Sequence, residues 1–263
     1  MATIPCFQVD AFTDRLFSGN PAAVCLLDTS RPAKWMQSVA TENNLSETAF
    51  IVPLKTGFRL RWFTPEVEVA LCGHATLASA HVLWSEGLAP RDMQLTFKTK
   101  SGLLSAVCRE QGIELNFPSS PAKKGGAAAA LKKALGVKPL NVVKAADDLL
   151  VEVASESVVR KLQPDLSLLK KIKVRGVIVT AKADKKYDFV SRFFAPAVGV
   201  DEDPVTGSAH CALAPYWAEK LDRQILRGYQ ASPRGGSVEV ELMDDRVLLR
   251  GAAITFMRGQ LVV

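Results

Sequence analysis

The segment FRLRWFTPEVEV (58–69) recurs later in the chain as FVSRFFAPAVGV (189–200), with six identical residues at a constant spacing of 131 positions. Past a three-residue insertion, a run of small residues also repeats, now at a spacing of 134: Gly73, Ala75, Ala78 and Ala80 match Gly207, Ala209, Ala212 and Ala214. A strand, a loop, a glycine and a helix therefore occur twice. This duplication predicts two similar lobes that face a cleft and deliver two helix N-termini to it, each a favourable place for an anion.

The composition is that of a globular protein, with 263 residues, 48% hydrophobic and 23% charged. Residues 118–140 begin with Pro, Ser and Gly and continue into a helix of Ala, Lys and Leu. Such a break in pattern indicates a linker. We therefore expect an N-terminal lobe at 1–118, with a last strand at about 253–263 that could return to it, and a C-terminal lobe at 119–252.

Hydrophobic periodicity predicts an α+β fold in which each lobe is a mostly antiparallel, barrel-like sheet around one central helix. The two central helices, 74–84 and 208–221, are rich in Ala and Leu and poor in charge. Helices of this kind are enclosed by other elements. A further helix is expected at 31–44 and a short helical region at 156–171. Strands are expected at 4–10, 22–28, 47–53, 58–64, 92–99, 102–109, 112–117, 141–145, 148–154, 174–181, 187–194, 237–243, 246–250 and 253–262.

Charge and cysteine usage exclude several classes of function. The net charge of +6 is modest, and no nucleic-acid-binding motif accompanies it. No stretch approaches about 18 apolar residues, so no membrane span is expected. The five cysteines include no CxxC pair and the N-terminus has no secretory pattern, which together predict a cytoplasmic protein with reduced thiols.

The two glycine-opened helices supply the first candidate binding residues. Gly73 lets the backbone approach a ligand, and His74 and Thr76 follow it in the first turn. In the second copy, Gly207 and Ser208 take the same place. Glycine and serine there could also be simple helix caps. Their repetition favours a binding role.

Glu47 is the candidate acid/base, since it begins a strand and is followed by a run of apolar residues. Partial burial there would favour proton transfer. A solvated edge residue, or a cap formed with Ser46, is the alternative. Asp203 precedes the second glycine turn and could orient an imidazole such as His74. The adjacent acids 201–203 cannot all face one ion, so no metal is expected.

Cys72 directly precedes the first glycine turn, where the field of the helix is expected to lower its pKa. Its counterpart in the second copy is Thr206. A racemase that uses two thiols needs one on each side of the reacting carbon atom. Because only one of these two counterpart positions is a cysteine, that mechanism is disfavoured.

Five motifs now indicate a family: GNPAAV (19–24), SETAF (46–50), CGHAT (72–76), DEDPVTGSAH (201–210) and PRGG (233–236). In content and order they resemble the phenazine-biosynthesis PhzF-like family over nearly the whole chain. The resemblance implies the diaminopimelate-epimerase fold, with two pseudo-symmetric lobes and the site between them.

The resemblance also implies roles for individual residues. Glu47 matches the acid/base glutamate of the family, and His74 and Asp203 match the polar residues beside it. Positions that hold the substrate, a small carboxylate, are matched by Ser46, Gly73, Gly207 and Ser208. The resemblance implies no cofactor and no metal, and a homodimer.

Three functions remain open from the sequence. The first is a cofactor-independent isomerase that transfers a proton through Glu47. The second is an amino-acid racemase or epimerase that uses Cys72, which occupies the position of a catalytic cysteine in related epimerases. The third is a non-catalytic binding protein on the same scaffold. Residues that select the substrate are expected in loops 12–20 and 228–236.

Overall fold

The computed structural model describes residues 3–110 and 112–262. The chain divides into two compact units, each described here by itself. Unit 1 comprises Met1–Asn116 and Arg250–Val263, and unit 2 comprises Phe117–Leu249. Within the described residues, none of the helices has the length and apolar character needed to cross a bilayer.

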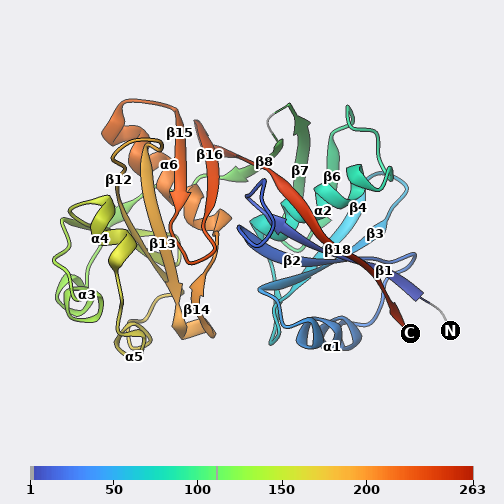
Figure 1. Cartoon of the computed structure of the whole chain (residues 1–263), viewed down its shortest axis with the longest axis horizontal. Coiled ribbons are helices and arrows are strands. Elements are labelled where there is room, and N and C mark those ends of the chain that lie inside the picture. The colour runs from blue at the N-terminus through green and yellow to red at the C-terminus, as the bar shows by residue number, and fades with distance from the viewer. Residues whose placement is uncertain (1–2, 111, 263) are drawn as a thin grey trace. The chain divides into compact units, whose positions relative to one another are not determined.

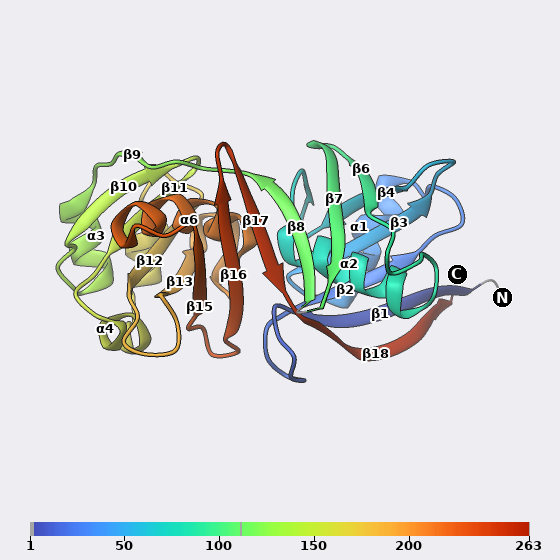
Figure 2. The ribbon, with the colours of Figure 1, turned by 90° about the horizontal axis from the view of Figure 1, so that it is seen from above.

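Unit 1 is a mostly antiparallel sheet in which the last strand of the chain pairs with the first. β1 pairs with β18 on one side and with β2 on the other, and the sheet continues through β3, β4, β6 and β7 to β8 (Figure 2). Among these pairs, β2–β3 and β4–β6 are parallel and the others are antiparallel. The strands are β1 (Thr3–Ala11), β2 (Asn20–Leu26), β3 (Glu47–Pro53), β4 (Phe58–Phe63), β5 (Glu68–Val69), β6 (Leu95–Thr99), β7 (Gly102–Arg109), β8 (Gly112–Pro118) and β18 (Ala253–Val262).

Unit 2 repeats this strand order. β10 pairs with β9 and β11, and the sheet continues through β12 and β13 to β15 and β16, with parallel pairs at β11–β12 and β13–β15. The parallel pairs thus fall at the same two places as in unit 1. The strands are β9 (Lys123–Lys124), β10 (Asn141–Ala145), β11 (Asp148–Glu152), β12 (Gly176–Lys182), β13 (Phe189–Ala195), β14 (Val200–Asp203), β15 (Ile225–Gln230), β16 (Gly236–Met243) and β17 (Arg246–Gly251).

Each unit is built around one central helix. In unit 1 this is α2 (Gly73–Ser85), which packs against β1, β2, β3 and β18. Eleven of its thirteen residues are buried, as its Ala- and Leu-rich sequence predicts. In unit 2 it is α6 (Gly207–Leu221), which packs against β11, β15 and β16. The α+β architecture expected from the sequence is confirmed.

The remaining helices lie outside the two sheets (Figure 1). In unit 1, α1 (Ala33–Asn43) packs on β3 and β4. In unit 2, α3 (Ala128–Leu135) packs against α5 (Leu166–Leu169), and α4 (Glu156–Lys161) packs on β12 and β13; the 3-10 helix η1 (Pro196–Val198) follows β13. The helical region expected at 156–171 is therefore two short helices, since Leu162 is extended and Asp165 caps the second helix.

The strand register relocates the three-residue insertion between the repeats. The sequence match aligns Val69 with Val200, which places the insertion after these residues. In the sheet, however, Val69 pairs with Trp62, whereas Asp203 pairs with Phe193, the counterpart of Trp62. The extra residues therefore lie in the turn that contains η1, before β14, and Asp203 is the counterpart of Val69.

Two-residue and edge strands are the main elements that the sequence patterns missed. β5, β9 and β14 are too short to show alternation. β15 was also missed, and its residues 228–230 belong to a strand although they were expected to lie in a substrate-selecting loop.

Candidate active site

The side chain of Glu47 enters the site from the first residue of β3. The parallel pairing of Glu47 with Ala22 holds this end of the strand beside β2. The strand that follows is buried from Thr48 to Ile51, whereas the side chain of Glu47 keeps 17% of its surface exposed. A carboxylate at the edge of a packed strand is fixed in position and still reachable.

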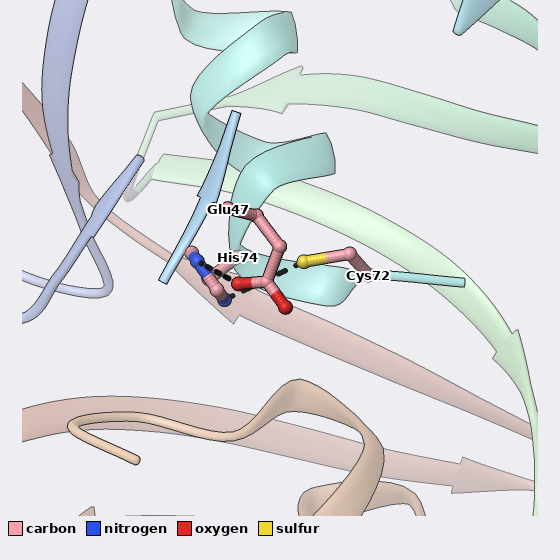
Figure 3. Close-up of side chains that lie close together, drawn as sticks. All are labelled: Glu47, Cys72 and His74. Carbon is pink, nitrogen blue, oxygen red and sulfur yellow. Dashed lines mark hydrogen bonds and ion pairs between the residues drawn. The ribbon is translucent and has the colours of Figure 1, made fainter. Parts of the chain in front are cut away.

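His74 lies in the first turn of α2 and meets Glu47. Its Nε2 lies 3.1 Å from Oε2 of Glu47, and the imidazole is almost fully buried (Figure 3). The two atoms form a close ion-pair contact, but they are not aligned as a hydrogen bond. Catalytic contacts are often poorly aligned until a substrate binds, so this geometry is compatible with an acid/base pair.

Cys72 is the residue before the first turn of α2, and its Sγ lies 3.6 Å from Nδ1 of His74. The expectation of a lowered pKa is wrong. Burial, followed by the negative charge of Glu47, raises the pKa of the Cys72 thiol above its ordinary value. Full desolvation of the thiolate therefore outweighs the helix field, and the resting side chain is a protonated thiol.

The charge state of His74 follows from the same neighbours. Burial lowers the pKa of an imidazole, but negative charge on Cys72 and Glu47 raises the pKa of His74 well above its ordinary value. The direction of this shift favours the imidazolium form of His74 beside the Glu47 side chain.

Asn20 is a residue of the cluster that sequence reasoning did not select. Its Nδ2 lies 3.2 Å from Nδ1 of His74, and the side chain is fully buried. An amide can turn to present either NH₂ or oxygen, so it can serve Nδ1 in both protonation states. The signal was present in the GNPAAV motif. Gly19 has φ +67°, and a Cβ there would lie 2.2 Å from the carbonyl oxygen of Ala11, so only glycine fits before Asn20.

The predicted residues of unit 2 gather at the start of α6. Thr206 is the N-cap, and its hydroxyl donates to Oδ2 of Asp203 at 2.5 Å. The amide of Gln230 donates to the backbone oxygen of Asp203. Ser208 accepts a hydrogen bond from Nη2 of Arg175 at 3.0 Å. Asp203 as the residue that orients His74 stays a prediction.

Thr76 and Ser46 differ in how the fold uses them. Thr76 is fully buried, and both its hydroxyl and its backbone N–H donate to the carbonyl oxygen of Cys72. Both donors are thus used inside the helix, which does not support the substrate contact predicted for Thr76. Ser46 is half-buried next to Glu47, and a substrate contact there remains a prediction.

Glu47, Cys72 and His74 together form a mixed cluster of potential ligand atoms. One ring nitrogen, one thiol sulfur and one carboxylate oxygen lie within 4.8 Å of one another. Cys72 and His74 are only two residues apart, and β3 brings Glu47 to them from 25 positions upstream. A spacing pattern confined to neighbouring residues cannot reveal such a cluster.

Comparison with known proteins defines the class to which this fold and cluster belong. The family model described as phenazine biosynthesis-like protein (PhzC-PhzF) matches residues 9–259. A curated protein of Halalkalibacterium halodurans named as an uncharacterized isomerase is 53% identical over 100% of both chains. The chain belongs to the PhzF-like family, as its motifs predicted.

Solved structures agree with this assignment. The crystal structure of a phenazine biosynthesis protein of the PhzF family from Enterococcus faecalis is 42% identical, covers 100% of both chains and superposes with a TM-score of 0.96. A probable proline racemase from Agrobacterium radiobacter covers 99% of this chain and 93% of its own, with a TM-score of 0.69 at 12% identity, which is a likeness of fold alone. The fold is therefore the predicted diaminopimelate epimerase-like α+β fold.

Proposed function

We propose that this protein is an isomerase that moves a proton on a small carboxylated metabolite, with Glu47 as the acid/base. The observation that carries the proposal is the contact of 3.1 Å between Oε2 of Glu47 and Nε2 of His74 in a buried setting. The name of the relative from Halalkalibacterium halodurans, an isomerase, supports the reaction class.

In this mechanism the Glu47 carboxylate removes a proton from a carbon atom of the substrate and returns it to another carbon or to another face. The developing negative charge on the substrate needs a donor nearby. The His74 imidazolium and the free N–H groups at the start of α2, beginning with Gly73, are positioned to supply it. The reaction as written uses no cofactor.

The substrate carboxylate is proposed to bind at helix N-termini. Ser46 and Gly73 are proposed for this role in unit 1, and Gly207 and Ser208 are proposed as an anion site of the same kind in unit 2. The hydrogen bond from Arg175 to Ser208 supports the second pair, because it places a fixed positive charge beside the first turn of α6. The homodimer expected from the resemblance remains part of this proposal.

A cysteine-dependent epimerase is a second candidate, because Sγ of Cys72 lies 3.6 Å from Nδ1 of His74. In that mechanism the neutral form of His74 would accept the thiol proton, and the resulting thiolate would be the base. The raised pKa of Cys72 makes the free thiolate rare at rest, so we place this mechanism second.

The two candidates are separated by solvent-deuterium incorporation followed by NMR. The substrates are a panel of cyclic and amino carboxylates that includes dihydrohydroxyanthranilate, proline derivatives and diaminopimelate. Wild type is compared with Glu47→Gln and Cys72→Ser, and Glu66→Gln, an exposed acid in the same unit, is the matched control. We expect Glu47→Gln to lower the exchange rate by about 10³-fold, the usual contribution of a general acid/base.

The outcomes differ clearly. Exchange that is lost in Glu47→Gln but kept in Cys72→Ser and Glu66→Gln supports the isomerase. Exchange lost only in Cys72→Ser assigns the protein to the epimerase mechanism. Full exchange in Glu47→Gln, in a variant that melts like wild type, contradicts the proposal. Binding of a compound from the panel without exchange in any variant would indicate a binding protein.

A further inference from the structure

The Glu47–Cys72–His74 cluster has a second chemical capacity, which proton transfer does not require. Three different donor atoms, nitrogen, sulfur and oxygen, converge within 4.8 Å at the first turn of α2 (Figure 3). Two of the residues, Cys72 and His74, are more than nine-tenths buried. A converging set of this kind is a binding site for any ion that prefers these donors.

The polar atoms at the centre of the cluster are not fully used by the protein. Oε2 of Glu47 and Nε2 of His74 are buried and have no aligned hydrogen-bond partner. A buried polar atom that lacks an aligned hydrogen bond is less stable than one that has it. The two atoms contact each other at 3.1 Å, and an ion that binds both can replace this unaligned contact.

The identity of the donors selects the ion. Thiolate and imidazole are ligands of zinc, whereas magnesium and calcium take oxygen ligands. Three protein ligands with a fourth position left open are typical of zinc sites that are accessible to small molecules. The cluster therefore fits zinc and does not fit the common hard cations.

Zinc coordination requires some of the donor atoms to move closer together. With zinc bonds of about 2.0–2.3 Å, the ligand atoms of a tetrahedral site lie about 3.3–3.6 Å apart. The Nε2–Oε2 distance is already 3.1 Å, and all three donor atoms lie within 4.8 Å. Because Sγ of Cys72 lies 3.6 Å from Nδ1, the other ring nitrogen, the thiol has to rotate toward Nε2 for one ion to reach all three donors.

Asn20 contacts the His74 ring without being one of the proposed metal ligands. Nδ1 of His74 contacts the amide of Asn20, which leaves Nε2 as the nitrogen directed to Glu47. A metal-bound histidine normally donates its other N–H to an oxygen that holds the ring in place. After a rotation of its amide group, the side-chain oxygen of Asn20 can accept this hydrogen bond from Nδ1 of His74.

From these observations we infer that Glu47, Cys72 and His74 form a zinc site, and that bound zinc blocks proton transfer. On binding, Sγ of Cys72 and Nε2 of His74 form bonds to the metal while the thiol proton and the proton on Nε2 leave to solvent, with no change of oxidation state. Zinc binding itself does not depend on the proposed isomerase function. The block does depend on it, since zinc would occupy the carboxylate that acts as the acid/base.

The test uses the full chain, treated with a chelator and kept reduced. Zinc binding is measured by calorimetry, and cobalt(II) is added as a spectroscopic probe because thiolate–cobalt coordination gives an intense near-ultraviolet band. We expect one ion per chain and no competition by magnesium. Cys72→Ser should abolish the band and weaken zinc binding by more than about 100-fold, since even the loss of a partner outside the ligand shell costs 10–100-fold.

Matched variants keep the test decisive. Cys211→Ser removes another buried cysteine, in unit 2, and should bind zinc like wild type. Asn20→Ala should weaken zinc binding by about 10-fold or more through loss of ring support. Cys25→Ser is included because Sγ of Cys25 lies 3.6 Å from Sγ of Cys6 and the pair is a possible competing site.

Three results would overturn the inference: no binding, equal affinity in wild type and a folded Cys72→Ser variant, or loss of binding in Cys25→Ser alone. Melting curves of the metal-free variants establish that they fold. If Cys72→Ser does not fold, Glu47→Gln takes its place as the variant that removes a ligand. These measurements use no substrate, so their failure is distinct from failure of the isomerase proposal. Once a substrate is known, zinc should suppress deuterium exchange in wild type.

Discussion

The starts of the two central helices share one backbone design and differ in their chemistry. Cys72 before α2 and Thr206 before α6 are both extended N-caps without a side-chain capping bond. Four residues later, Thr76 and His210 each direct a side chain back to the carbonyl oxygen of that N-cap residue. The repeat therefore preserves how the helix begins, even where the residues are different.

The difference lies in what faces the first turn. In unit 1, His74 meets the carboxylate of Glu47. In unit 2, the counterpart of His74 is Ser208, which meets the guanidinium of Arg175, itself paired with buried Asp148. The sheet register makes Gly176 the counterpart of Glu47, because Thr48 pairs with Phe63 as Val177 pairs with Phe194. One unit thus carries a group that can exchange protons, and the other carries an arginine that is paired with a buried carboxylate.

The largest expected effect concerns the ion pairs that the repeat preserves. Arg61 bonds Glu68 through two N–H groups and lies over Phe63, and Arg192 bonds Glu202 in the same way. Arg192 is more buried, with 10% of its side chain exposed against 26% for Arg61, and it also donates to the backbone oxygen of Leu162. We expect Arg192→Met to lower the free energy of unfolding by about 3 kcal/mol, because it leaves a largely buried carboxylate unpaired.

Arg61→Met is the matched control for that change. Glu68 retains Lys100 at 2.6 Å, so its charge is not left alone. We expect a loss of about 1 kcal/mol, measured with Arg192→Met by urea denaturation followed by fluorescence. Equal losses in the two variants would contradict the view that the deeper burial of Arg192, together with the second cation beside Glu68, distinguishes the two copies.

These paired contacts show why much of the fold could be predicted from the sequence. Arg61 and Phe63 recur as Arg192 and Phe194 because each pair stabilises the same strand and turn, and contacts of this kind are preserved in the sequence. The enclosed helices, the long strands and the α+β class follow from such patterns. β14 and β15 could not be predicted, because pairing with β13 and not local alternation makes them strands.

The second prediction concerns acid stability and the histidine of unit 2. Burial lowers the pKa of His210 from 6.5 to about 4. A lowered histidine pKa means that, between these values, the unfolded chain binds the proton and the folded chain does not. The resulting stability is full above pH 6.5 and falls as the pH drops toward 4. The loss is about 2 kcal/mol at pH 5 relative to pH 7.

His210→Asn isolates this contribution, since its amide can still donate to the carbonyl oxygen of Thr206 as the imidazole does. The variant should show a shallower fall in melting temperature between pH 7 and pH 5 than wild type, in parallel scans. Thr76, the counterpart in unit 1, does not titrate, so Thr76→Ser should leave the pH profile unchanged. If the melting temperature falls equally with pH in wild type and in His210→Asn, His210 is not the cause of the acid sensitivity.

The candidate site was predicted only in part, and for a physical reason. Glu47, His74 and Cys72 were identified because each lies beside a conspicuous glycine turn or strand start. The involvement of Asn20 depends on β1 and β2, which bring it to His74 from 54 positions away. The pKa of Cys72 also could not be predicted, since a helix terminus is visible in sequence but the burial that raises the pKa is not.

The smallest expected effect tests whether unit 2 could hold a side chain where unit 1 holds Glu47. A Cβ on Gly176 would lie 2.3 Å from the ring of Phe193, and the guanidinium of Arg175 covers that ring at 5.4 Å. Gly176→Ala should therefore cost about 1–2 kcal/mol in unfolding free energy through overpacking, measured by urea denaturation. Gly126→Ala is the matched control, because Gly126 has open space around it and, like Gly176, no positive φ. A neutral Gly176→Ala would mean that packing does not restrict this position to glycine.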